Sequence, residues 1–113
     1  MGKNNPVLSL LGLCARGRNL VSGEFSVEKA VKERKALMVI VAEDASENTK
    51  KSYSDMCAYY NVPLYFFGSK SSLGHAIGRE ERAGIAILDV GMADGIAKKL
   101  EVVEATEVMN ESK

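Results

Sequence analysis

Residues 37–42 are Leu-Met-Val-Ile-Val-Ala, an apolar run without one polar side chain. A strand with one face in water alternates polar and apolar residues, so an unbroken run predicts a strand covered by helices on both faces. Helical patterns flank the run on both sides. We therefore predict that 37–42 is a central strand, and a structure with this segment helical or at a sheet edge would contradict the predicted fold.

Two helices are predicted on the N-terminal side of this strand. An Asn-Pro pair at residues 5–6 starts the first and Gly17 ends it, so this helix covers 6–16. A short strand is expected at 19–21, and a second helix opens at Ser22-Gly23. Three apolar residues at helical spacing form the inward face of the second helix: Val27, Ala30 and Val31.

Helices and strands also alternate on the C-terminal side. Asp44 and Glu47 have the spacing of a capping box, which predicts a third helix. Its buried stripe is expected to contain Tyr53, Met56, Cys57 and Tyr60. Further elements are expected as a buried strand at 64–67, a helix at 71–77, a strand at 83–88 and a helix at 93–100. This order predicts an α/β fold, a three-layer α/β/α sandwich with a mixed sheet of about four strands.

The composition is that of one ordinary globular domain. The 113 residues are 46% hydrophobic and 27% charged, and no apolar run approaches the roughly 20 residues that a membrane span needs. We assign residues 1–100 to a single domain and residues 101–113 to an acidic C-terminal extension, which either continues a helix or frays. Two cysteines without partner spacing, Cys14 and Cys57, are expected to be reduced, buried thiols in a cytoplasmic protein.

Sequence patterns for catalysis or cofactor binding are weak. His75 is the single histidine and has no nucleophile or metal ligand near it in sequence, so we expect it to face solvent on a helix. Residues 68–71, Gly-Ser-Lys-Ser, imitate the end of a phosphate loop, but Pro63 stands where that loop needs its first glycine. Glu43 and Asp44 follow a strand, where capping explains Asp44. We therefore expect no enzyme, cofactor, metal or small-molecule substrate.

The candidate site lies on the second helix. Net charge is zero, yet residues 1–35 hold seven Lys and Arg against three Glu, a balance of +4. At about 100° per residue, Phe25, Lys29 and Lys32 lie within roughly 60° of one another on the outer face. Lysine and helix N–H groups bind phosphate, and an exposed aromatic ring stacks on an unpaired base. The alternative is a solvated helix face, with the charge diluted by glutamates and Phe25 folded onto the core.

Several short motifs resemble the superfamily of ribosomal proteins of the L7Ae and L30e type, especially its short bacterial YlxQ-type members. They occur in the family's order over about residues 5–100, and they are specific as a set. The N-terminal motifs are Leu11-Gly12-Leu13, Gly17, Leu20-Val21-Ser22-Gly23 and Lys29-Ala30-Val31. The later motifs are Ala36 to Asp44 with Ala45-Ser46, Val62-Pro63, Leu73-Gly74 and Ala76-Ile77-Gly78.

The resemblance implies an α/β/α domain that binds kinked, internally looped RNA, often within ribonucleoprotein particles. It implies a contact helix that starts at Gly23 and carries a basic residue at Lys29, and a second contact loop at 78–83. Two positions differ from archaeal kink-turn binders: Phe25-Ser26 replaces an Asn-Glu pair, and Arg79-Glu80-Glu81-Arg82 replaces an apolar loop.

A non-catalytic RNA-binding or ribosome-associated protein is therefore the leading hypothesis. The expected partners are structured RNA, ribosomal or otherwise kinked, and the ribosome. A protein-interaction module on the same fold is the alternative, and a small enzyme is the third class. The residues expected to contact RNA are Gly23, Glu24, Phe25, Lys29, Lys32, Arg16, Arg18, Gly78, Arg79 and Arg82.

Overall fold

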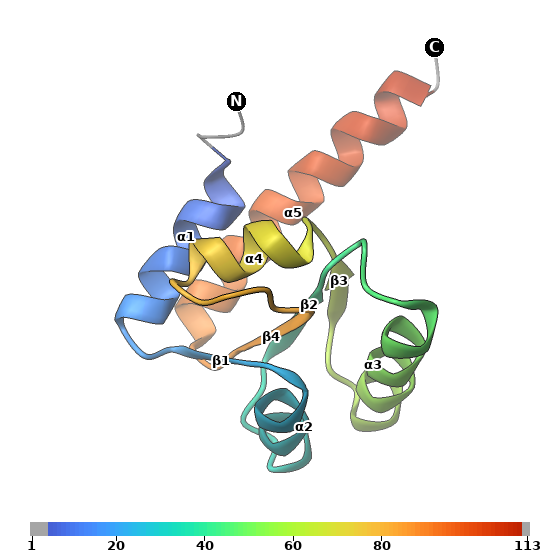
Figure 1. Ribbon diagram of the computed structural model, residues 1–113. Helices are drawn as coiled ribbons and strands as arrows, with labels where there is room; N and C mark the ends of the chain where they lie inside the picture. The colour runs from blue at the N-terminus through green and yellow to red at the C-terminus, as the bar shows by residue number, and fades with distance from the viewer. Residues whose placement is uncertain (1–4, 112–113) are drawn as a thin grey trace.

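The computed structural model describes the backbone of residues 5–111 and the side chains of residues 5–101. Helices and strands alternate along the described chain, as Figure 1 shows. In chain order they are α1 (Pro6–Arg16), β1 (Leu20–Ser22), α2 (Glu24–Lys32), β2 (Met38–Val41), α3 (Glu47–Tyr60), β3 (Leu64–Phe66), α4 (Lys70–Ala76), β4 (Gly84–Ile87) and α5 (Val90–Glu111).

The strands form one mixed sheet in the order β1-β4-β2-β3. Strand β4 runs antiparallel to both β1 and β2, whereas β2 and β3 are parallel. The apolar run at 37–42 therefore supplies an interior strand, which confirms the prediction. The prediction that residues 64–67 form a buried strand was wrong, because β3 lies at the sheet edge and 42% of the Phe66 side chain is exposed.

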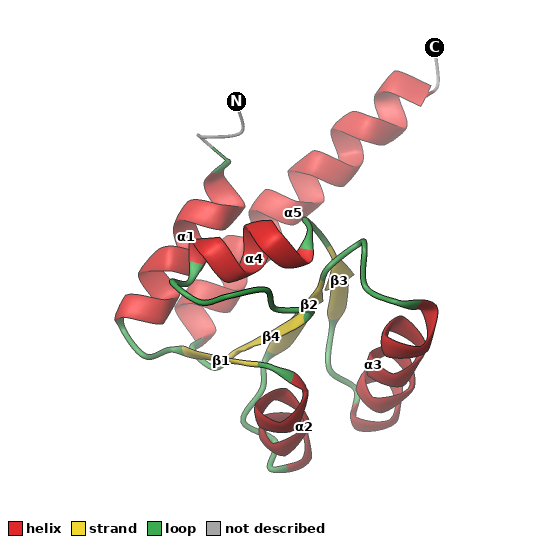
Figure 2. Ribbon diagram, in the orientation of Figure 1, coloured by secondary structure: helices red, strands yellow, loops and turns green. Residues whose placement is uncertain are grey.

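Helices cover both faces of the sheet, so the three-layer α/β/α sandwich is confirmed. Figure 2 shows α1, α4 and α5 on one face and α2 and α3 on the other. Alternate residues of β2 point into the two layers, with Met38 and Ile40 in the first core and Val39 and Val41 in the second. The two-sided burial explains why β2 contains no polar side chain.

Helix caps agree with the sequence at α1 and differ at α3. The Asn5 side chain accepts hydrogen bonds from the N–H groups of Val7 and Leu8, at 2.9 and 3.3 Å. At α3, however, Ser46 is the cap and accepts from Thr49 N–H at 3.1 Å, so the predicted capping role of Asp44 there was wrong. Asp44 instead accepts from Lys70 N–H at 2.8 Å, which places a carboxylate at the positive end of α4.

Helix α5 begins three residues before its predicted start and continues past residue 100. Asp89 accepts a hydrogen bond from Met92 N–H at 2.9 Å, a cap that the apolar spacing did not reveal. The backbone from residue 101 to 111 continues the helix rather than fraying. The weak apolar repeat expected at Val102, Ala105 and Met109 lies outside the described side chains.

Candidate nucleic-acid interface

Three arginines from two loops surround one hollow of about 390 Å³. Arg18 follows α1, whereas Arg79 and Arg82 belong to the loop between α4 and β4. Two hydroxyl-bearing residues line the same hollow, Ser22 at the end of β1 and Ser26 in the first turn of α2. We call this feature the arginine hollow. It brings together arginines that are up to 64 positions apart in the sequence.

Backbone hydrogen bonds fix the loop that carries two of the arginines. Arg79 N–H donates to the Gly74 carbonyl at 2.8 Å, and Arg82 N–H donates to the Lys70 carbonyl at 3.1 Å, so the loop folds back along α4. The Arg82 side chain then crosses to β1, where its Nε donates to Ser22 Oγ at 3.0 Å. This bond joins the two predicted contact segments and sets the position of one guanidinium in advance.

Two glycines with positive φ border the interface, Gly23 at +91° and Gly78 at +74°. A Cβ atom added at either position would meet no heavy atom within 4 Å. Backbone conformation, rather than crowding by the protein, therefore requires glycine at both sites. Gly23 is the N-cap of α2 without a side-chain cap, which leaves the first N–H groups of the helix available for an anion. The open space in front of both glycines gives a ligand backbone room to approach.

The outer face of α2 is divided between two surroundings. Lys29 forms an ion pair with Glu33 at 3.1 Å and lies on the same side as Ser26. Lys32 forms an ion pair with Glu28 at 2.7 Å, and its side chain faces α3. Each ion pair shifts a pKa through its hydrogen bond and its charge. Lys29 lowers the pKa of Glu33, and Glu28 raises the pKa of Lys32.

Phe25 lies between these two sides with 77% of its side chain exposed. The alternative in which this ring folds onto the core was wrong. By contrast with the lysines, none of the three arginines of the hollow forms an ion pair with any residue that the structure describes. The positive charges of the arginine hollow are therefore unpaired within the described structure, whereas Lys29 and Lys32 of α2 are both paired.

Of the ten expected contact residues, Arg18, Arg79 and Arg82 line the hollow, and three others lie apart from it. Arg16 lies against Gly12 of its own helix and does not line the hollow. Glu24 and Lys32 face α3, on the other side of α2. Ser22 and Ser26 were missed as site residues. A helical wheel could have found Ser26, which lies on the Lys29 side of α2, but nothing in the sequence indicates that Ser22 binds Arg82.

The two cysteines and the single histidine of the chain do not line the arginine hollow. Both cysteines are buried and free, as expected, and burial raises their pKa values to about 11, with the Asp89 carboxylate contributing at Cys14. Such thiols stay protonated at neutral pH and are poor nucleophiles. His75 is exposed on α4, as expected. Among the described residues, no cluster of three His, Cys, Asp or Glu side chains could hold a metal ion, and no helix has the length and apolarity to cross a membrane.

Residues 6–97 match the model of the ribosomal protein L7Ae/L30e/S12e/Gadd45 family. The chain belongs to this family. The RNA-binding protein YlxQ of Bacillus subtilis (strain 168) is 42% identical over 92 residues, which are 81% of this chain and 92% of that protein. The resemblance inferred from the motifs is thereby confirmed.

Two solved structures superpose well on the chain. A Bacillus halodurans protein of unknown function has a TM-score of 0.81 at 41% identity and covers 84% of this chain and 96% of its own. The Giardia lamblia 15.5kD RNA binding protein has a TM-score of 0.71 at 27% identity, with 88% of this chain and 85% of its own covered. The two contact segments implied by the family resemblance, the start of α2 and the loop at 78–83, both border the arginine hollow.

Proposed function

We propose that this chain is a non-catalytic RNA-binding protein of ribosomes or related ribonucleoprotein particles, and that the arginine hollow holds the backbone of kinked or internally looped RNA. One observation carries the proposal. Three arginines without ion pairs in the described structure surround a hollow, and two glycines with open space in front of them lie next to it. Arginine is suited to phosphate because its planar guanidinium donates two parallel hydrogen bonds. The RNA-binding names of two relatives support the same function.

Each part of the interface has a distinct task in this proposal. Arg18, Arg79 and Arg82 contact phosphates, and the serine hydroxyls and the N–H groups at the start of α2 contact phosphate or ribose oxygens. Phe25 stacks on a base that the kink leaves unpaired. Lys29 exchanges its partner Glu33 for RNA, and the exchange costs little because this ion pair is solvent-exposed.

We assign RNA binding to residues 1–100. We assign no RNA contact to the acidic segment 101–113, because its carboxylates repel phosphate. We expect the protein to act in the cytoplasm, where ribosomes and their RNA are found. An RNA kink-turn with tandem G·A pairs tests which RNA the chain selects, because Phe25-Ser26 replaces the Asn-Glu pair of archaeal kink-turn binders.

Replacing Lys29 with alanine is expected to weaken RNA binding by about 1–3 kcal/mol if Lys29 contacts a base edge, and by less if it contacts phosphate. Folding should be unaffected because the side chain is exposed. Fluorescence anisotropy with a labelled RNA hairpin that contains a three-nucleotide internal loop measures the affinity. A straight RNA duplex of equal length is expected to bind more weakly.

Lys98→Ala is a closely matched control for this change. Lys98 forms the same kind of i,i+4 ion pair, with Asp94 at 3.3 Å, and lies on α5 outside the lining of the hollow. Gly23→Val should also reduce affinity, because a side chain there occupies the open approach and strains a backbone with φ of +91°. Equal losses for Lys29→Ala and Lys98→Ala would show diffuse attraction and disprove the proposed site.

A further inference from the structure

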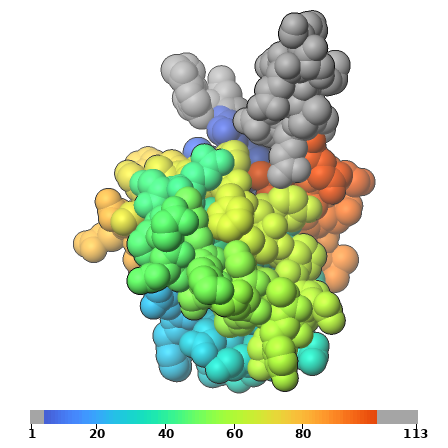
Figure 3. Space-filling view, turned by 90° about the vertical axis from the view of Figure 1, so that its right-hand side faces the viewer, coloured from blue at the N-terminus to red at the C-terminus, as the bar shows by residue number. Residues whose placement is uncertain are grey.

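A second concave surface lies on the other side of α2, between α2 and α3. This groove has a volume of about 350 Å³, and its lining includes Glu24, Glu28, Lys32, Tyr53 and Tyr59. Figure 3 views the face that α3 occupies, with α2 along its lower edge. We call this feature the acidic groove. Its carboxylates repel phosphate, so RNA is not its natural occupant.

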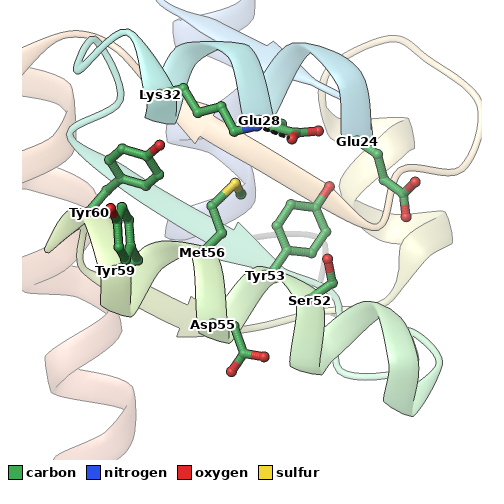
Figure 4. A pocket seen from close by; sticks show the side chains of 9 residues that line it. All are labelled: Glu24, Glu28, Lys32, Ser52, Tyr53, Asp55, Met56, Tyr59 and Tyr60. Carbon is green, nitrogen blue, oxygen red and sulfur yellow. Dashed lines mark ion pairs between the residues drawn. The ribbon is translucent and has the colours of Figure 1, made fainter.

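The floor of the groove contains a buried hydroxyl without a hydrogen-bond partner. Figure 4 shows the ring of Tyr53 rising from α3 toward α2. Only 3% of the residue is exposed, and its hydroxyl finds no partner among the described residues. The ring packs against Gly84 of β4, where a Cβ atom would overlap the hydroxyl. Buried polar groups are almost always hydrogen-bonded, so the exception points to a missing partner.

Charge at the same end of the groove favours a cationic partner. The Glu24 carboxylate makes no ion pair or hydrogen bond with another described residue. Burial, with a smaller contribution from the charge of Glu24, raises the pKa of Tyr53 to about 12. The Tyr53 hydroxyl therefore stays neutral and is able to accept a hydrogen bond from a cation. Lys32 is held by Glu28, so the charge of Glu24 remains uncompensated.

Exposed aromatic surface continues the groove at its other end. Tyr59 is 78% exposed, and its ring meets the edge of Tyr60 with centroids 4.8 Å apart. The Arg34 guanidinium already lies 5.6 Å from the centroid of the Tyr60 ring. This aromatic pair thus accommodates a guanidinium within the protein itself, and Tyr59 offers a second ring to solvent.

We propose that the acidic groove binds an arginine side chain in a basic peptide segment of a partner protein, with the guanidinium between the Glu24 carboxylate and the Tyr53 hydroxyl and the peptide lying over Tyr59. Arginine fits better than lysine because its guanidinium is planar, weakly hydrated and able to donate to both oxygens at once. The proposal does not depend on RNA binding, although α2 would then carry RNA on one side and protein on the other.

The test uses a fluorescein-labelled Gly-Arg-Gly-Arg-Gly-Arg-Gly peptide with blocked ends and the full chain. Glu24→Gln and Tyr59→Ala are each expected to weaken binding by about three- to tenfold. Lys32→Ala should tighten binding by a few fold, because it frees Glu28 and removes a like charge. Glu47→Gln is the matched control at the far end of α3, where it removes an exposed carboxylate outside the groove. It should leave the affinity unchanged.

Tyr53→Phe separates a binding role from a structural one. Loss of an unpaired buried hydroxyl should leave the thermal midpoint unchanged or raise it, while peptide affinity falls. A lower midpoint with unchanged affinity would overturn the proposal. Equal binding of spermidine, or of the same peptide with lysine in place of each arginine, would also overturn it, as would an equal effect of Glu24→Gln and Glu47→Gln. Arg18→Gln should reduce RNA binding and leave peptide binding unchanged, so failure of either proposal can be told from failure of the other.

Discussion

Replacing Gly74 with alanine is expected to lower the free energy of unfolding by about 3 kcal/mol. A Cβ atom at this position in α4 would overlap the Glu80 carbonyl group and lie 3.1 Å from Glu81 Cα. These are backbone atoms, which cannot rotate away as a side chain would. The loop at 78–83 would have to leave α4, and the hydrogen bond from Arg79 N–H to the Gly74 carbonyl would be lost with it.

Gly95→Ala provides the matched comparison. Gly95 is also inside a helix, but the nearest atom to its Cβ would be Leu10 Cδ1 at an ordinary 4.0 Å. Alanine is a better helix former by about 0.5–1 kcal/mol, so this change should maintain or increase stability. Urea denaturation followed by circular dichroism measures both variants. Similar midpoints for the two would show that the loop does not rest on α4 as described.

Replacing Arg18, Arg79 and Arg82 together with glutamine is expected to weaken RNA binding by about 100-fold near 0.1 M salt. Each arginine–phosphate contact that is lost also abolishes the release of counterions from that phosphate. The slope of log affinity against log salt concentration should therefore become shallower by about two to three. Titrations of the looped hairpin at several KCl concentrations give both quantities. The comparison variant replaces Lys51, Lys98 and Lys99 with glutamine.

The comparison variant removes the same charge away from the hollow, so long-range attraction affects both proteins alike. We expect it to lose a few fold in affinity at most. Of the three arginines, we expect Arg82 to contribute most to RNA affinity, because its Nε is already held 3.0 Å from Ser22 Oγ. If the two triple variants lose equal affinity and equal slope, the arginine hollow has no special role.

The sequence was informative about the fold wherever local pattern and tertiary position agree. The run at 37–42 is apolar on both faces because helices cover both faces, and the structure places it inside the sheet. The segment Leu64–Phe67 has the same apolar character, yet β3 is an edge strand. Strand order depends on which partners the other strands find, and apolarity along one segment carries no information about that choice.

The candidate site shows a similar division. Helical spacing placed Phe25, Lys29 and Lys32 on the outer face of α2, and all three are exposed. Spacing could not tell that α3 packs beside Lys32 and draws it, with Glu28, into a different groove. Helical spacing also could not predict the contact between Arg82 and Ser22, which are 60 residues apart. The two residues meet because the strand order places β4 beside β1.

Ultraviolet crosslinking of the protein to RNA in its own cells, with mass spectrometric identification of the linked residues, tests the central claim most directly. We expect crosslinks in two stretches, residues 18–29 and 78–82, with Phe25 prominent because its exposed ring stacks on a base. Sequencing the attached RNA should recover fragments with kinks or internal loops. Crosslinks concentrated on α3 or α5, with none in these two stretches, would contradict the account.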